Sequence, residues 1–111
     1  MSTHTIANRT VEPCASDLIS QMGMTSLVHQ MASLVDSCIE SRTSQGGSIA
    51  YQESIENPDD WEILVVTRLK ISPEECFKLS LRIGEDLARL ISQDPSDPNW
   101  LRVSYRLEIA R

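Results

Sequence analysis

Residues 61–92 read WEILVVTRLKISPEECFKLSLRIGEDLARLIS, and this stretch decides the fold class. Between Trp61 and Ile71, apolar side chains and one threonine occupy every second position. A period of two is typical of a β-strand. Leu64 and Val66 make the centre of this strand apolar on its other side as well. The pattern therefore predicts a central strand that is covered on both faces in its middle.

A helix is predicted directly after this strand, over residues 72–92. Ser72 is a suitable N-cap, Pro73 fits the first helical position, and Glu75 completes a capping box. An apolar stripe at helical spacing predicts a buried face, which is made of Cys76, Leu79, Ile83, Leu87 and Leu90, and is widened by Phe77, Leu81, Ala88 and Ile91. The change from a period of two to a helical period indicates a mixed α and β protein.

Two further strands are predicted on either side of this unit. Residues 48–56 alternate, and the Asn-Pro-Asp-Asp sequence of residues 57–60 joins them to the central strand through a turn, so an antiparallel hairpin is expected. Residues 100–110 also alternate, with five apolar side chains directed inward, namely Leu101, Val103, Tyr105, Leu107 and Ile109.

The N-terminal part of the chain carries weaker signals. Residues 16–42 have an apolar stripe at helical spacing, and Gly23 either divides this segment into two helices or weakens a single one. Ser and Gln dominate its outer face, so few ion pairs support it and the helix depends on burying its stripe. Residues 1–15 are expected to be a flexible arm.

Together these segments predict a single α+β domain over residues 16–111. We expect a small two-layer sandwich in the order α-β-β-α-β, with an antiparallel hairpin, a third strand and both helices on one face. If residues 3–11 form a strand, the order becomes βαββαβ, which is the ferredoxin-like arrangement. The first strand is central there, and residues 3–11 are not strongly apolar.

The charge is concentrated in the first half of the chain. The 10 basic and 16 acidic residues give a net charge of −6, and residues 1–60 carry all of it. An acidic protein is repelled by phosphate backbones, so nucleic-acid binding is disfavoured. No apolar run is long enough for a membrane helix, and no secretory signal is predicted. Three widely spaced cysteines imply no disulfide framework, so a reduced, cytoplasmic protein is expected.

Catalytic and metal-binding patterns are absent from the sequence. Cys76 is one turn into the predicted helix, near the positive end of its dipole, so it is a candidate reactive thiol. It also falls on the apolar stripe, and a core cysteine is the alternative. No motif links it to His4 or His29. No paired metal ligands and no phosphate-binding glycine motif occur, so no metal and no cofactor are predicted.

One face of the sheet is the candidate partner-binding surface. The alternation places Trp100, Arg102 and Arg106 of the last strand beside Arg68 and Lys70 of the central strand. Tryptophan and arginine are enriched in interface cores. We therefore expect a small non-enzymatic protein-binding or regulatory domain that acts as a homodimer. The alternatives are a small cysteine- or carboxylate-dependent enzyme, and an acidic regulator that binds a basic protein or, weakly, single-stranded nucleic acid.

Overall fold

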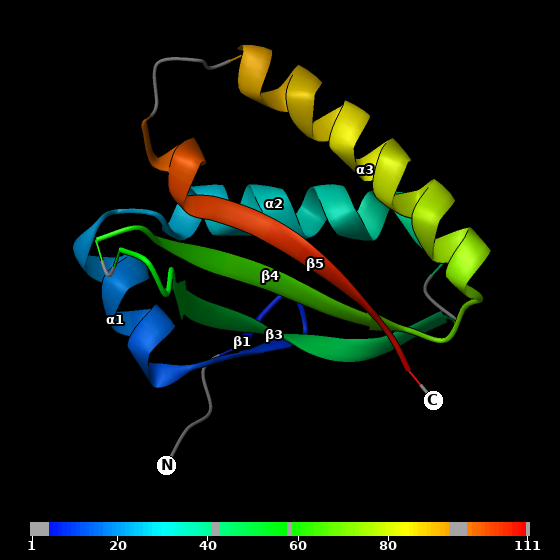
Figure 1. Ribbon diagram of the computed structural model, residues 1–111, viewed down its shortest axis with the longest axis horizontal. Coiled ribbons are helices and arrows are strands. Elements are labelled where there is room, and N and C mark those ends of the chain that lie inside the picture. The colour runs from blue at the N-terminus through cyan, green and yellow to red at the C-terminus, as the bar shows by residue number, and fades with distance from the viewer. Residues whose placement is uncertain (1–4, 41–42, 58, 94–97, 111) are drawn as a thin grey trace.

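The computed structural model describes residues 5–40, 43–57, 59–93 and 98–110. Within these residues the chain forms five strands, three α-helices and a 3-10 helix. In chain order they are β1 (Thr5–Ile6), β2 (Arg9–Val11), α1 (Pro13–Gln21), α2 (Thr25–Cys38), β3 (Ser44–Glu53), β4 (Trp61–Leu69), α3 (Pro73–Gln93), η2 (Pro98–Arg102) and β5 (Val103–Ile109) (Figure 1). The predicted α+β class is confirmed.

The five strands form one open mixed sheet in sequential order, β1-β2-β3-β4-β5. β1 pairs with β2 and β3 pairs with β4 in antiparallel fashion, whereas β2–β3 and β4–β5 are parallel. The predicted hairpin of β3 and β4 is confirmed. The sheet has five strands instead of three, and β2 lies outside β3, so the order is not ferredoxin-like with a central first strand.

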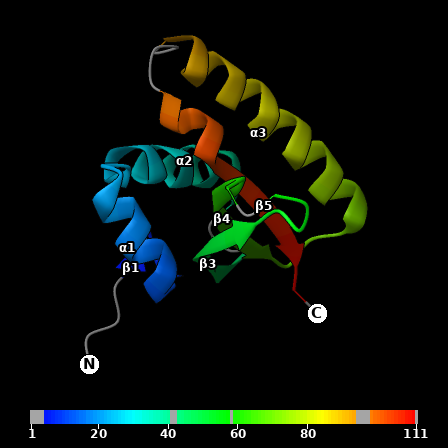
Figure 2. The ribbon, with the colours of Figure 1, turned by 60° about the vertical axis from the view of Figure 1, so that its left-hand side comes forward.

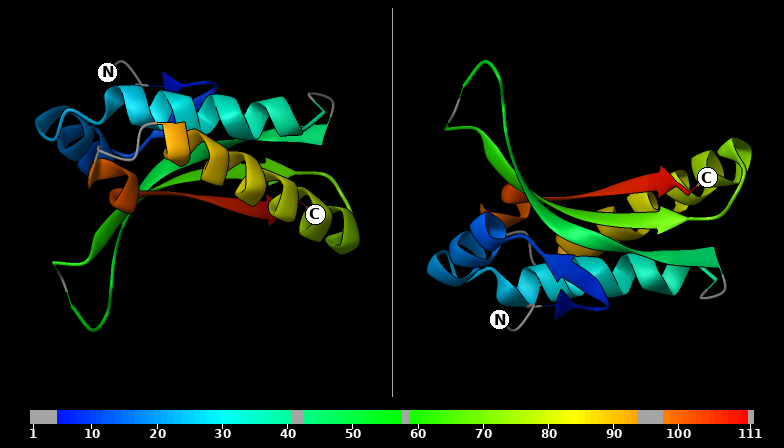
Figure 3. Two further views of the ribbon diagram at one scale, coloured as in Figure 1. Left: turned by 90° about the horizontal axis from the view of Figure 1, so that it is seen from above. Right: turned by 90° about the horizontal axis from the view of Figure 1, so that it is seen from below.

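The two helical crossovers have opposite hands. Both α2 and α3 lie on the same face of the sheet, which Figure 3 shows from above and from below. The β2–β3 pair runs opposite to the β4–β5 pair because β3 and β4 are antiparallel. The connection through α3 is right-handed, and the one through α1 and α2 is left-handed, against the strong general preference.

Residues 5–11, which the sequence assigned to a flexible arm, form a hairpin at the sheet edge. Ala7 and Asn8 make its turn with positive φ angles of 50° and 65°. This is the conformation of a type I′ turn, whose twist matches that of the flanking strands. Ile6 and Val11 are buried, with exposed fractions of 2% and 6%. The hairpin therefore contributes to the core although its sequence is mostly polar.

The helical segment is divided at Gly23, which has a φ of 65°. Met24 donates its backbone N–H to the carbonyl of Ile19, and Gly23 donates to Ser20, which is the Schellman pattern of a helix end. Met24 is fully buried. The glycine therefore ends α1 and lets α2 begin in a new direction over the sheet (Figure 2).

The core lies between the helices and one face of the sheet. Ile63 and Val65 of β4 are fully buried there, as the alternation predicts, together with Val28 and Met31 of α2. Leu64 and Val66 point to the opposite face, with exposed fractions of only 5% and 7%. At the start of α3, Glu75 donates its backbone N–H to the Ser72 hydroxyl at 3.2 Å, which confirms the predicted cap.

Gly47 lies at an irregularity in the β3–β4 register, where the two backbones approach closely. A Cβ atom at this position would overlap the carbonyl oxygen of Val66. Gly47→Ala is therefore expected to lower the free energy of unfolding by about 1–3 kcal/mol, the usual cost of overpacking. Urea denaturation measures this.

Gly84→Ala is the matched control for Gly47→Ala. The nearest atom to its new Cβ is the Tyr105 hydroxyl at 3.6 Å, an ordinary contact within a helix. This change is expected to stabilise the protein by about 0.5–1 kcal/mol through helix propensity. Equal effects of the two substitutions would contradict the close approach at Gly47.

Candidate functional site

Trp100 and Arg102 do not lie on the predicted partner-binding face. The chain forms η2 at this point, and the strand alternation begins only at Val103. Trp100 is a core residue with an exposed fraction of 6%. The Arg102 guanidinium lies 4.8 Å from the centre of the Trp61 ring and donates to the carbonyls of Asp59 and Trp61 at 3.0 Å each. Trp100 therefore belongs to the core, and Arg102 closes one end of the β3–β4 hairpin.

Arg68 and Arg106 do share the open face of the sheet, on neighbouring strands. In the parallel β4–β5 register, Arg68 stands beside Glu108, and Val66 stands beside Arg106. Arg68, Arg106 and Glu108 are all exposed. Lys70 follows the end of β4, where its backbone N–H donates to Thr43. This part of the face therefore carries a mixture of charges, without the tryptophan and Arg102 that the sequence placed on it.

Cys76 is partly exposed and lines a groove between α3 and β5. The groove has a volume of about 530 Å³. Its walls are formed mainly by apolar and aromatic side chains, including Phe77, Tyr105, Leu107 and Ile109. His29 lines a different hollow, between α2 and α3. His4 lies outside the described residues. The structure therefore places no described histidine beside Cys76 as a general base.

The same region contains a free sheet edge. β5 pairs with β4 on one side, and no other strand within residues 5–40, 43–57, 59–93 and 98–110 pairs with it. The Ala110 N–H donates to the Leu69 carbonyl at 2.8 Å, so residues of even number direct their backbone groups toward β4. By strand alternation, Tyr105, Leu107 and Ile109 direct their N–H and C=O groups outward.

Large exposed apolar side chains gather beside this edge. Phe77 and Leu81, one turn apart on α3, have exposed fractions of 65% and 55%, and Ile109 of β5 has 39%. The sequence placed Phe77 and Leu81 on the buried stripe of the helix, but the sheet ends at β5 and does not reach beneath them. We call the set formed by Phe77, Leu81, Tyr105, Leu107 and Ile109 the β5 edge surface.

Tyr105 holds the two walls of the groove together. Its hydroxyl donates to the Ser80 carbonyl at 3.0 Å and lies 3.4 Å from the Ser80 hydroxyl. This bond connects β5 to the middle of α3 and fixes the helix above the strand. The β5 edge surface therefore combines a fixed groove with unpaired backbone groups, which suits it to binding an extended chain.

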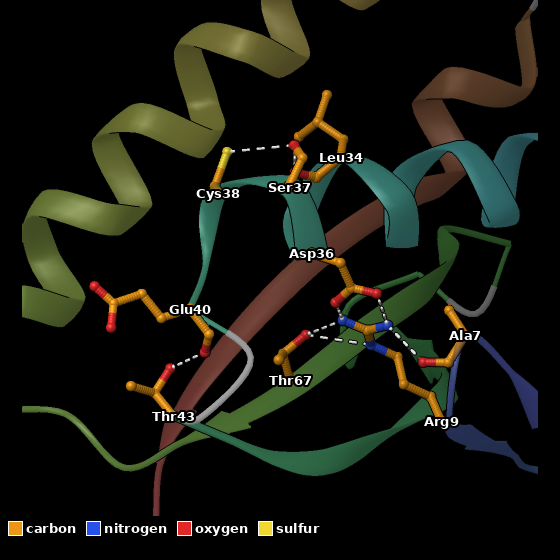
Figure 4. A network of polar contacts seen from close by, with 9 residues as sticks. All are labelled: Ala7, Arg9, Leu34, Asp36, Ser37, Cys38, Glu40, Thr43 and Thr67. Carbon is orange, nitrogen blue, oxygen red and sulfur yellow. Dashed lines mark hydrogen bonds and ion pairs between the residues drawn. The ribbon is translucent and has the colours of Figure 1, made fainter.

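A buried arginine network lies under α2, where Arg9 of β2 meets Asp36 of α2 and Thr67 of β4 (Figure 4). Arg9 has an exposed fraction of 2%, and its guanidinium forms a two-pronged ion pair with Asp36 at 2.7 and 3.2 Å. It also donates to the hydroxyl of the fully buried Thr67 and to the Ala7 carbonyl. Its five N–H donors are thus engaged within the chain, and the network connects β2, α2 and β4 as a structural clamp.

Sequence reasoning missed this network. Its members are separated by 27 and 58 positions along the chain, and no short motif joins them. The available signal was a single arginine between the apolar residues Ile6 and Val11. That signal is weak, because an arginine in a polar segment is ordinarily solvated.

Two titratable side chains have shifted pKa values. The hydrogen bond that Tyr51 donates to the Glu53 carboxylate at 2.6 Å, together with burial, raises the pKa of Tyr51 to about 12. Burial, followed by the hydrogen bond from its thiol to Asp86, raises the pKa of Cys38 above its ordinary value. Both groups therefore stay protonated at neutral pH, which disfavours them as bases or nucleophiles.

The described part of the chain offers neither a metal-binding cluster nor a membrane-spanning helix. It holds no group of three or more His, Cys, Asp or Glu side chains arranged to bind a metal ion. Among its helices, none has the length and apolar character needed to cross a membrane. No protein family, curated protein or solved structure matches this chain in a comparison of sequence or fold.

Proposed function

We propose that this protein is a non-enzymatic protein-binding domain and that the β5 edge surface is its binding site. The observation that carries this proposal is the free edge of β5 beside the exposed Phe77 and Leu81. An unpaired strand edge attracts a further strand, and natural proteins usually protect such edges with charges, prolines or a covering element. Here exposed apolar side chains flank the edge on the helix side, and the charges of Arg106 and Glu108 lie on the open face, which favours a binding role.

The central test compares two substitutions of an exposed apolar residue by aspartate. Phe77→Asp places a charge in the β5 edge surface, whereas Ile55→Asp makes the same kind of change at the β3–β4 hairpin, where Ile55 is fully exposed. Truncation or disruption of an interface anchor costs about 2 kcal/mol or more, so Phe77→Asp is expected to weaken binding roughly thirty-fold. A partner of the β5 edge surface should bind Ile55→Asp like the natural chain. Ile55 also lines the hollow at the end of the β3–β4 hairpin, so a partner of that hollow would respond to Ile55→Asp and not to Phe77→Asp.

The measurement uses the immobilised natural chain and the two variants, with circular dichroism to verify that each variant is folded. Proteins from a native lysate, including further copies of the chain, are quantified on each surface by mass spectrometry. The proposal predicts at least one protein that the natural chain and Ile55→Asp retain equally and that Phe77→Asp loses. Equal retention by all three folded chains would exclude the β5 edge surface as the binding site.

A second candidate function is supported by the hollow at the end of the β3–β4 hairpin. Its volume is about 580 Å³, and Glu53, Glu56, Asp60 and Glu62 line it together with Arg102. The excess of carboxylates suits a lysine- or arginine-rich protein segment. Binding there should weaken steeply as salt is raised, whereas binding through the apolar β5 edge surface should depend little on salt.

A further inference from the structure

We propose that the partner of the β5 edge surface is a second copy of this chain. Two copies would pair through antiparallel β5 strands around a two-fold axis that passes beside Leu107. This inference rests on the proposed function, because it names the occupant of the same surface. A homodimer joined by one self-complementary patch is the commonest closed assembly of soluble proteins.

The backbone of β5 limits how two copies can pair. In an antiparallel ladder, residues that direct N–H and C=O groups at each other stand opposite one another. Tyr105, Leu107 and Ile109 are the residues with outward groups, as the Ala110 to Leu69 hydrogen bond establishes. Odd-numbered residues must therefore face odd-numbered residues of the second copy. The two-fold axis consequently passes beside one residue and not between two.

The charges on the open face then select the register. An axis beside Arg106 would place Arg106 opposite itself, and an axis beside Glu108 would place Glu108 opposite itself. Like charges directly opposite in a sheet are destabilising. An axis beside Leu107 places Arg106 opposite Glu108 of the second copy, and this happens twice by symmetry. These are pairs without backbone hydrogen bonds, in which opposite side chains lie closest.

An axis beside Tyr105 is the remaining register that pairs most of the strand. It would place Arg106 opposite Ser104 and would bring Glu108 against Arg102, which lies in η2 outside the strand. The Arg102 guanidinium is already bound to the carbonyls of Asp59 and Trp61. This register therefore gives no ion pair within the ladder, and the axis beside Leu107 is favoured.

The apolar side of the strand agrees with the same register. Leu107 would face Leu107 of the second copy, and Tyr105 would face Ile109 of the second copy, so apolar side chains continue across the join. α3 lies on the helix-covered side of the sheet close to β5 in Figure 3 (left). Phe77 lines the groove between these two elements. Phe77 and Leu81 of both copies would then cover the join from the helix side. The β5 edge of each copy would then be paired with the β5 edge of the other.

A charge-reversal experiment tests the register. Arg106→Glu places four carboxylates at the join, and Glu108→Arg places four guanidinium groups there. Each single variant is expected to raise the dimer dissociation constant at least tenfold, because two attractive pairs become repulsive. Sedimentation equilibrium over a range of concentrations measures this constant. Arg89→Glu, an exposed charge reversal elsewhere on α3, is the matched control and should change it less than threefold.

Mixing the two variants separates a lost contact from a lost fold. Arg106→Glu and Glu108→Arg chains, each monomeric alone, should form a heterodimer, because every opposing pair is again attractive. The double variant in one chain should also dimerise within threefold of the natural chain. A natural chain that stays a 12.5 kDa monomer at high micromolar concentration would overturn the inference.

Two outcomes distinguish this inference from the proposed function. If the chain dimerises but neither Arg106→Glu nor Glu108→Arg raises the dimer dissociation constant, the pairing of β5 strands is wrong. If the chain is monomeric but a different protein is lost on Phe77→Asp and retained on Ile55→Asp, the second copy is wrong and the binding surface stands. If Phe77→Asp weakens binding neither to a second copy nor to any other protein, both the dimer and the proposed binding surface are wrong.

Discussion

Trp100→Ala is expected to lower the free energy of unfolding by about 3–5 kcal/mol, the usual cost of removing a large aromatic side chain from a core. Trp100 is 6% exposed and belongs to the same cluster as Ile63 and Val103. The loss combines the transfer free energy of the indole with the cavity left behind. Urea denaturation followed by far-UV circular dichroism measures the change.

Leu101→Ala is the matched control, because Leu101 is the next residue in η2 and is 86% exposed. Its effect on the free energy of unfolding should stay within about 0.5 kcal/mol. Trp100→Phe should fall between the two, since the Trp100 indole N–H has no hydrogen-bond partner among the described residues and only volume is lost. Equal, small effects of Trp100→Ala and Leu101→Ala on the free energy of unfolding would contradict the burial of Trp100 in the core.

Asp36→Ala is expected to lower the free energy of unfolding by about 3 kcal/mol. The substitution removes the partner of Arg9, whose side chain is 3% exposed, and leaves its charge buried without compensation. Breaking a buried ion pair from one side typically costs about 3–5 kcal/mol. The lower end applies because the Asp36 side chain is 42% exposed, so water reaches the pair from that side.

A triple variant separates two contributions to the free energy of unfolding, namely the penalty of an unpaired buried charge and the net stabilisation by the whole network. Arg9→Met, Asp36→Ala and Thr67→Val together remove every polar member and keep an apolar side chain of similar length at the buried position. This variant should be more stable than Asp36→Ala alone and within about 1–2 kcal/mol of the natural chain. Thermal denaturation of both variants, with exposed Glu85→Ala as a control, decides this. A triple variant as unstable as Asp36→Ala would contradict the explanation.

The elements that depend on local rules agree with the sequence. The Ser72 cap, the alternating burial of β4 and the hairpin of β3 and β4 all arise from residues close together in the chain. Period and turn chemistry act within a few residues, so one sequence is enough to predict them. For the first helical segment the sequence left two alternatives open, and the positive φ of Gly23, which ends α1, decides for two helices.

The candidate site was predicted only in part, because local patterns do not report where a strand begins or how far a sheet extends. A strand at the position of β5 was expected, and Arg106 lies on the open face as the alternation requires. Trp100 and Arg102 were assigned to that face by extending the alternation three positions too far, into η2. Phe77 and Leu81 were expected to be buried, because helical periodicity reports an apolar face but does not report how far the sheet extends beneath it.

The sequence by itself determined the α+β class, the boundaries of the capped helix and the alternation that places Arg106 and Glu108 on one side of β5. Tertiary structure decided the rest. It recruited residues 5–11 into the sheet through contacts between Arg9 and the distant Asp36 and Thr67. It also buried Trp100 and left the edge of β5 free. These outcomes depend on which segments meet in space, and contacts between distant residues leave no periodic signal in the chain.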